Sequence, residues 1–136
     1  MFDLKGKVAI VTGAGSQSGI GFASAKILVK AGASVLVTST TDRIFERVKE
    51  LKCSFGNNRA EGLTADLTDE KQVRKLIKTA TDRFSKIDIL VNNAGMVQIG
   101  SNQPSKKFSE LTVDSWNYGI NINLKSTFLV TRHVLP

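Results

Sequence analysis

The sequence predicts an α/β protein built on a doubly wound parallel sheet, and three observations support that fold class. A continuous apolar run at 8–11 passes directly into a glycine-rich segment at 12–21. Short apolar runs then alternate with longer segments of helical periodicity along the rest of the chain. The apolar runs are continuous, which is typical of parallel strands covered by helices on both faces. We therefore expect one domain over residues 1–136, with four strands and the helices that follow them.

The first strand and the segment after it predict a phosphate-binding loop. Val8–Val11 is expected to be a strand, and the residues that follow include Gly13, Gly15, Gly19 and Gly21. Glycines let backbone amides approach a pyrophosphate at the N-terminus of the next helix. A tight strand-to-helix turn without a ligand is the alternative for this segment taken by itself. A helix ending at Gly32 is expected from the apolar residues that recur at helical spacing, which are Ile20, Ala23, Ile27, Leu28 and Ala31.

The second and third strands are expected at Val35–Val37 and at 60–65, the latter ending at Asp66. Asp42 is expected to cap the helix between them. That helix carries an apolar face made of Ile44, Val48 and Leu51. The alternation of strand and helix thus continues through the middle of the chain.

The last elements follow the same alternation. Thr68 is expected to cap a helix whose buried face consists of Val73, Leu76, Ile77, Ala80 and Phe84. Residues 87–91 predict the fourth strand, and a polar loop with Pro104 comes after it. Thr112 is then expected to cap a long helix with a shared stripe of Trp116, Ile120, Leu124 and Phe128.

Composition and charge narrow the class of protein. The chain is 41% hydrophobic and has no apolar stretch long enough to span a bilayer and no basic-then-apolar leader, so we expect a cytoplasmic protein without membrane insertion. The net charge of +7 raises nucleic acid as a partner. The basic residues are scattered, however, and the basic helix face of Lys71, Arg74, Lys75 and Lys78 has no interleaved aromatics, so we do not expect nucleic-acid binding.

Neither the cysteine nor the histidine predicts a metal or catalytic site. Cys53 is the only cysteine and is expected in a helix-to-strand connection, without a neighbouring histidine. His133 is the only histidine and lies near the end of an amphipathic helix, where a packed or surface role is the common one. We therefore expect no metal.

Four motifs in sequence order resemble the short-chain dehydrogenase/reductase family. They are Thr12-Gly13 with Gly19-Ile20-Gly21, then Asp66-Leu67, then Asn92-Asn93-Ala94-Gly95, then Trp116 followed by Asn123-Leu124. They cover essentially the whole chain, and the Asn-Asn-Ala-Gly motif after the fourth strand is the most diagnostic. The resemblance implies a Rossmann-type fold, of which this chain holds the first four strands and their helices. It also implies hydride transfer between the nicotinamide of NAD(P)(H) and a carbonyl or alcohol carbon.

The resemblance also implies roles for individual residues. Gly13, Gly19, Ile20 and Gly21 would line the pyrophosphate, Asp66 and Leu67 would border the adenine ring, and Asn93, Ala94 and Gly95 would flank the ribose and the central sheet. Asp66 has an alternative role in capping the turn before Thr68. One departure is the five residues between Gly13 and Gly19, where the family usually has three. We expect the loop to bulge or to use Gly15 as its second close-approach glycine.

Cofactor choice is expected to depend on the end of the second strand. An acidic residue there would bind the adenosine ribose and repel an added phosphate. Ser39 stands at that position, Thr40 follows, and Arg43 is within reach, so the sequence favours NADP(H) over NAD(H). One arginine bond of about 1.5 to 3 kcal/mol corresponds to roughly ten- to hundredfold in affinity. Asp42 argues for NAD(H), although a helix-capping role accounts for it.

The catalytic groups are only partly matched. Asn123 matches the family's asparagine, which helps to hold a water in a proton relay; a polar kink in a helix is the alternative. The family's serine and Tyr-x-x-x-Lys pair have no match, because the residue four positions after Tyr118 is Ile122. We expect that the chain is truncated before them and has negligible activity alone.

Three functional interpretations therefore follow from the sequence. The first is part of an active reductase, for which the segment at 39–40 somewhat resembles 3-oxoacyl reductases. The second is a non-catalytic nucleotide-binding protein or partner-dependent half, and the third is a basic nucleic-acid-binding module. By analogy with the family, we expect a homo-oligomer that uses the 112–135 helix as its interface.

Overall fold

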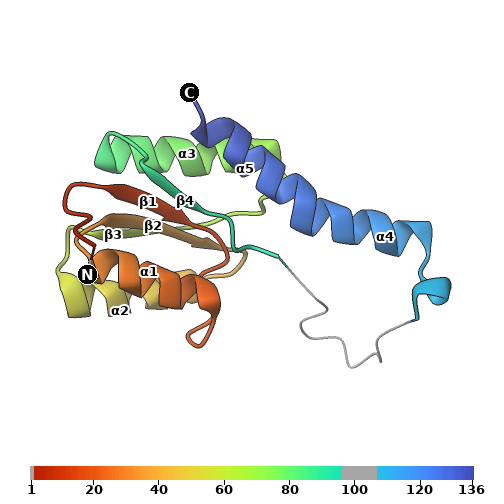
Figure 1. Cartoon of the computed structure of the whole chain (residues 1–136), viewed down its shortest axis with the longest axis horizontal. Helices are drawn as coiled ribbons and strands as arrows, with labels where there is room; N and C mark the ends of the chain where they lie inside the picture. The colour runs from red at the N-terminus through yellow and green to blue at the C-terminus, as the bar shows by residue number, and fades with distance from the viewer. Residues whose placement is uncertain (1, 96–106) are drawn as a thin grey trace.

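The computed structural model describes residues 2–95 and 107–136, and within them four strands form one parallel sheet (Figure 1). The strands are β1 (Val8–Val11), β2 (Ser34–Ser39), β3 (Ala60–Thr64) and β4 (Ile89–Val91), arranged in the order β3-β2-β1-β4. The chain moves outward from β1 to β3 and then crosses back to the other side of β1. This reversal is the topological switch point at which doubly wound folds form their ligand sites. The predicted fold class is confirmed.

Helices cover both faces of the sheet (Figure 1). On one face, α1 (Ile20–Lys30) and α2 (Arg43–Phe55) pack against Val11, Val35 and Val37. On the other, α3 (Glu70–Phe84) and α5 (Ser126–Val134) pack against Ile10 and Leu36. All four residues of β1 are buried, because neighbouring side chains point to opposite faces and both faces are covered. This two-sided burial explains why the sequence of β1 is apolar throughout.

The buried face of α1 differs from the face expected from the sequence. Ile20 and Ile27 are 78% and 68% exposed, whereas the buried residues are Gly21, Phe22, Ala25 and Val29. Two apolar stripes of helical spacing run along this helix, and only one can face the sheet. The stripe with Phe22 buries a large aromatic ring, and it also turns Gly21 toward the loop after β1, where no side chain fits.

The predicted faces of α2 and α3 are confirmed, while two of the predicted caps differ. Ile44, Val48 and Leu51 are buried in α2, and Val73, Leu76 and Ala80 are buried in α3. The cap of α3 is Asp69, whose carboxylate accepts a hydrogen bond from the amide of Lys71, and it is not Thr68. Asp42 occupies the cap position of α2 without a side-chain hydrogen bond. Cys53 lies in the last turn of α2 and not in the connection after it.

The long C-terminal helix is interrupted and does not bury the expected stripe. After η1 (Phe108–Glu110), it consists of α4 (Val113–Ile120), a π turn η2 (Asn121–Lys125), and α5. Thr112 caps α4 as predicted, accepting from the amide of Ser115 at 3.1 Å. The predicted stripe is solvent-exposed, with Trp116 at 54%, Ile120 at 37%, Leu124 at 61% and Phe128 at 56%. The π turn shifts the phase of the helix, and α4 extends beyond the end of the sheet (Figure 1).

Candidate functional site

The carboxyl ends of the four strands meet at one edge of the sheet, and a cavity of about 540 Å³ lies there. Nine of the residues predicted as site residues line it, namely Gly13, Gly15, Ser39, Thr40, Arg43, Asp66, Leu67, Ala94 and Gly95. Gly19, Ile20, Gly21, Asn93 and Asn123 were also predicted and are not among its lining residues. Ligands of doubly wound sheets bind outside the carboxyl ends of the strands, so the cavity is the candidate functional site.

Thr12 and Asn93 tie the loop after β1 to the segment after β4. The Thr12 hydroxyl accepts from the amides of Asn93 at 3.0 Å and Ala94 at 2.9 Å, and donates to the carbonyl of Val91 at 3.3 Å. The Asn93 side chain donates in return to the carbonyls of Thr12 at 3.1 Å and Gly13 at 3.0 Å. Together, the hydrogen bonds of the Thr12 hydroxyl and the Asn93 side chain hold the loop after β1 and the segment after β4 in fixed positions beside the cavity.

Glycine is required where these loops touch. A Cβ at Gly13, whose φ is +68°, would lie 2.7 Å from the Cα of Ala94. A Cβ at Gly21 would lie 2.7 Å from the carbonyl oxygen of Gly13. Gly15 approaches the end of β2 instead, since a Cβ there would lie 2.7 Å from the hydroxyl oxygen of Ser39. The enlarged loop also contains a turn, in which the amide of Gly19 donates to the carbonyl of Ser16 at 3.1 Å.

The end of β2 holds an arginine in a small hydrogen-bonded network. The Ser39 hydroxyl donates to the Thr41 carbonyl at 2.8 Å and accepts from the Thr41 amide at 3.1 Å. The Arg43 Nε donates to the Thr41 hydroxyl at 3.1 Å. Arg43 lines the cavity and makes no ion pair with any residue in the described ranges. A guanidinium with free N–H groups beside a cavity is suited to an anionic ligand group.

At the end of β3, Asp66 makes the turn that leads into α3. Its carboxylate accepts from the amide of Thr68 at 2.9 Å and from the hydroxyl of Thr68 at 2.7 Å. Its amide donates to the Gln72 side chain at 2.9 Å. Gln72 also bonds the Asp69 carboxylate, and this bond, with that from the Lys71 amide, lowers the pKa of Asp69. The alternative role of Asp66, in capping the turn before Thr68, is therefore observed in the structure. Asp66 also lines the cavity.

The remaining wall comes from the C-terminal helix. Tyr118, Ile122 and Ser126 line the cavity from α4, η2 and α5 in turn. Asn123 lies within the π turn, and its side chain donates to the carbonyl of Gly119 at 3.0 Å. A Cβ at Gly95 would lie 2.5 Å from the Asn123 side-chain oxygen, so Asn123 lies against the segment after β4. Single π turns inside α-helices are frequent at functional sites.

Comparison with known proteins identifies the family. The model of the short chain dehydrogenase family matches residues 7–136. The chain belongs to the short-chain dehydrogenase family.

Curated relatives of this chain include Oxidoreductase UcpA of Escherichia coli, strain K12. That protein is 36% identical over 136 residues, which are 100% of this chain and 48% of the relative. The 3-oxoacyl-[acyl-carrier-protein] reductase FabG of Vibrio harveyi is 36% identical over 133 residues, which are 98% of this chain and 50% of the relative. The chain thus spans about half the length of the curated relatives it matches.

Solved structures show the same fold. A short-chain dehydrogenase/reductase from Brucella melitensis superposes with a TM-score of 0.83 at 29% identity, covering 99% of this chain and 53% of that one. A blue fluorescent protein from a metagenomic library, solved in complex with NADPH, has a TM-score of 0.80 at 32% identity, covering 97% of this chain and 51% of that one.

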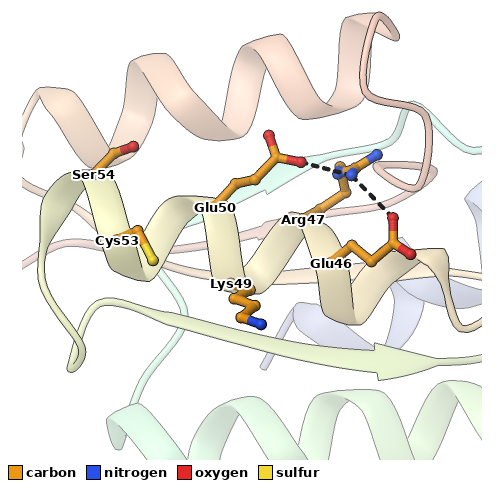
Figure 2. A pocket seen from close by; sticks show the side chains of 6 residues that line it. All are labelled: Glu46, Arg47, Lys49, Glu50, Cys53 and Ser54. Atoms are coloured by element: carbon orange, nitrogen blue, oxygen red, sulfur yellow. Dashed lines mark hydrogen bonds and ion pairs between the residues drawn. The ribbon is translucent and has the colours of Figure 1, made fainter.

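A second pocket, of about 530 Å³, lies on α2, away from the strand ends (Figure 2). Arg47 bonds Glu50 at 2.6 Å and Glu46 at 3.2 Å, as the dashed lines in Figure 2 show. The ring of Phe22 lies 5.5 Å from the Arg47 guanidinium carbon. Because the charged guanidinium is neutralised within the pocket by two carboxylates, it is not available to an anion. Cys53 is exposed at the rim of the pocket.

The surroundings of His133 and the helices of the described residues bear on the expectation of no metal and no membrane insertion. The His133 ring bonds the Glu70 carboxylate at 2.8 Å, and this hydrogen bond lowers the pKa of Glu70. Among the described residues, no three His, Cys, Asp or Glu side chains gather as a metal site. No helix in the described ranges combines the length and apolar character needed to cross a membrane.

Several residues at or beside the cavity were not predicted from the sequence as site residues. Thr12, which does not line the cavity, was part of the glycine motif, but its role in bonding the segment after β4 depends on a contact 81 residues away. Tyr118, Ile122 and Ser126 are spaced four apart, a spacing that keeps side chains near one face of a helix, but the sequence does not show that this face meets the ends of the strands.

Proposed function

We propose that this chain is the NAD(P)(H)-binding part of an oxidoreductase that transfers hydride between nicotinamide and a carbonyl or alcohol carbon. The observation that carries the proposal is the cavity at the carboxyl ends of the strands, where the glycine loop, the ends of β2 and β3 and the segment after β4 meet. The similarity to an oxidoreductase, a reductase and an NADPH-bound structure supports it. On this proposal, residues 1–136 form a single Rossmann domain.

The residues in the cavity fit a dinucleotide. Gly13, Gly15, Gly19, Ile20 and Gly21 would border the pyrophosphate, because the loop has no side chains where it approaches its neighbours and leads into the N-terminus of α1. The adenine ring would lie beside Asp66 and Leu67, and the ribose near the segment that contains Asn93, Ala94 and Gly95. The Asn93 side chain serves this arrangement by holding the Gly13 carbonyl.

NADP(H) is the proposed cofactor in preference to NAD(H). The end of β2 presents the hydroxyls of Ser39 and Thr40 where an acidic residue would repel a 2′-phosphate, and Arg43 lines the same cavity without an ion-pair partner in the described ranges. A charge-assisted bond from Arg43 to a 2′-phosphate would contribute about 1.5 to 3 kcal/mol, or roughly ten- to hundredfold in affinity. Asp42, which occupies the cap position of α2 without a side-chain cap bond, is the counter-argument.

Asn123 is the proposed catalytic residue of this chain. The bound nicotinamide supplies or accepts the hydride, and the proton must travel separately. Asn123 would help to hold a water of the proton relay, from a π turn that brings it against Gly95. We propose a small carbonyl or alcohol substrate, of the kind that a 3-oxoacyl reductase uses, because a reductase of that type is 36% identical. We also propose that the protein is cytoplasmic and that it forms a homo-oligomer through the 112–135 helix.

Binding measurements on the protein test the cofactor proposal. Calorimetric titration should give tighter binding of NADPH than of NADH, and Arg43→Ala should weaken NADPH by roughly ten- to hundredfold while leaving NADH nearly unchanged. Arg59→Ala is the matched control, because it removes the same charge from an exposed position before β3, at the opposite edge of the sheet. Equal affinity for both cofactors would contradict the NADP(H) preference. Absence of binding by both would contradict the dinucleotide site itself.

The non-catalytic alternative is tested by turnover. A reductase assay with NADPH and short 3-oxoacyl compounds should show cofactor oxidation by the full-length protein and a loss of kcat in its Asn123→Ala variant. Tight NADPH binding without oxidation of NADPH in the presence of any carbonyl compound would favour a nucleotide-binding protein that lacks catalysis.

A further inference from the structure

Tyr118 lines the cavity from α4 and has no part in the function proposed above. It is the only tyrosine in the chain. Its side chain is 63% exposed, so packing within the fold does not account for an aromatic residue at this position. Its surroundings in the cavity therefore indicate what the ring can contact.

The ring belongs to a stripe of three cavity residues on the C-terminal helix. Tyr118, Ile122 and Ser126 are spaced four apart, a spacing that keeps side chains near one face of a helix, with a modest drift around it in an α-helix of 3.6 residues per turn. The turn at 121–125 is wider, since its hydrogen bonds span five residues, and it reduces this drift. Ser126 is 3% exposed and Ile122 is half-buried, so Tyr118 lies at the outer, solvent end of the stripe.

The other lining residues come from the ends of the strands. Leu67, which is 7% exposed, and Thr68 follow β3 and line the same cavity as Tyr118. The cavity thus has an apolar residue from the β3 end and an aromatic ring from the helix. Such a lining is suited to a flat heterocycle, because an aromatic ring can stack on its face without any specific hydrogen bond.

We propose that Tyr118 forms an aromatic wall of the adenine subsite and stacks on the adenine ring of the cofactor. This inference rests on the proposed dinucleotide binding and adds a contact from α4 to the strand-end residues. Stacking of one base on one aromatic side chain corresponds to about 5- to 150-fold in affinity. Because stacking involves only the face of the adenine ring, the contact should contribute equally to the binding of NADPH, NADH and 5′-AMP.

Calorimetric titration of variants with 5′-AMP and NADPH tests the contact. Tyr118→Ala should weaken both ligands by a similar factor, within about 5- to 150-fold, and Tyr118→Phe should bind nearly as tightly as the wild type. Trp116→Ala is the matched control: Trp116 is an aromatic residue on the same helix, 54% exposed, and does not line the cavity. This control should retain wild-type affinity.

The outcomes separate this inference from the function on which it rests. If the wild type binds neither ligand, the dinucleotide site fails, and the inference fails with it. If the wild type binds both and Tyr118→Ala binds equally well, the inference alone is wrong. Equal weakening by Trp116→Ala would assign the effect to α4 in general and overturn the contact. Equal weakening by Tyr118→Phe would replace stacking with a hydroxyl bond and overturn the proposal as stated.

Photolabelling gives a second readout that does not depend on a folded Tyr118 variant. The wild-type protein is irradiated with 8-azidoadenosine 5′-monophosphate, digested with trypsin and mapped by mass spectrometry. Label at Tyr118, in the peptide that ends at Lys125, should be suppressed by NADPH. NADPH-suppressed label confined to the residues after β3 would show that the adenine ring lies away from α4 and would overturn the proposal.

Discussion

Replacement of Gly13 by alanine tests whether the contact between the two loops requires glycine. Gly13 has a φ of +68°, which costs a residue with a Cβ about 1–2 kcal/mol. Alanine recovers about 0.4–1 kcal/mol through the unfolded state. The new Cβ would lie 2.7 Å from the Cα and 2.9 Å from the amide nitrogen of Ala94. That backbone is held by Thr12, so it cannot move without breaking hydrogen bonds.

The magnitude follows from adding the backbone and overlap effects. The net backbone effect is about 0–1.6 kcal/mol, and overpacking against a fixed neighbour adds about 1–3 kcal/mol. Gly13→Ala should therefore lower the free energy of unfolding by roughly 1–4.6 kcal/mol, a large part of the stability of about 5–15 kcal/mol typical of domains.

Two other glycines separate the effects. Gly6 has a φ of +76° with no atom within 4 Å of its Cβ position, so Gly6→Ala measures the backbone effect alone. Gly21 lies within α1 with a negative φ, and a Cβ there would lie 2.7 Å from the Gly13 carbonyl oxygen. Gly21→Ala therefore measures overlap without the backbone effect, less the roughly 0.5–1 kcal/mol that alanine gains in a helix.

Urea unfolding of the three variants gives the free energies to compare, if one common slope is used for the dependence of the free energy of unfolding on urea concentration. The expected order of destabilisation has Gly13→Ala clearly above Gly6→Ala. A Gly13→Ala variant within about 0.5 kcal/mol of Gly6→Ala would refute the reasoning, because the two loops would then have room for a methyl group at their contact.

Three further predictions concern other positions. Ser85 has a φ of +70° after α3, so Ser85→Gly should raise the free energy of unfolding by about 1 kcal/mol, read as a higher Tm; a lower Tm would contradict it. Thr41→Val removes the hydroxyl that accepts from Arg43 and should reduce the ratio of NADPH to NADH affinity, while Thr41→Ser should preserve it. Hydrogen bonds from the Val8 amide and from Lys86 hold the pKa of Asp88 below its usual value. The ionised Asp88 carboxylate therefore stabilises the folded state above the pKa of about 4 that it has in the unfolded chain, and this stabilisation is lost as the pH falls through the folded-state pKa. Asp88→Ala should lower the free energy of unfolding near pH 7 and weaken the fall of the urea midpoint as the pH is lowered into the acid range. An unchanged dependence of the urea midpoint on acid pH would refute the stabilising role of Asp88.

The order of the elements could be predicted from the sequence because burial on both faces makes parallel strands uniformly apolar. β1 is the clearest case, with four apolar residues that are all buried. The faces of α2 and α3 could be predicted because each helix has one apolar stripe. The face of α1 could not, because Ile20 and Ile27 form a second stripe, and the choice between them depends on the contact between Gly21 and the loop after β1. That contact joins segments whose relative position local periodicity does not specify.

The residues of the candidate site were predicted at the strand ends, whereas on the C-terminal helix only Asn123 was predicted. Parallel strands bring their carboxyl ends to one edge, so residues that follow different strands, such as Ser39, Asp66 and Ala94, were expected together, and all three line the cavity. The helix wall depends on how a later segment crosses that edge, for which the sequence gives no comparable rule. The enlarged spacing between Gly13 and Gly19 was predicted to make Gly15 a close-approach glycine, and Gly15 does approach a neighbouring segment closely. The segment that it approaches, at Ser39 at the end of β2, was not predicted.

The shared stripe of the C-terminal helix was predicted, whereas its exposure and the π turn within the helix were not. Asn123 donates to the carbonyl of Gly119, Ser126 to that of Ile122, and Thr127 to that of Asn123. Each side chain bonds a carbonyl four residues earlier, where an α-helix would place a backbone amide. Polar side chains at 123, 126 and 127 can therefore replace backbone bonds that a wider turn disrupts. Ser24, Thr79 and Thr81 make the same kind of bond within the regular helices α1 and α3, so these bonds accompany the π turn here but do not predict it from the sequence.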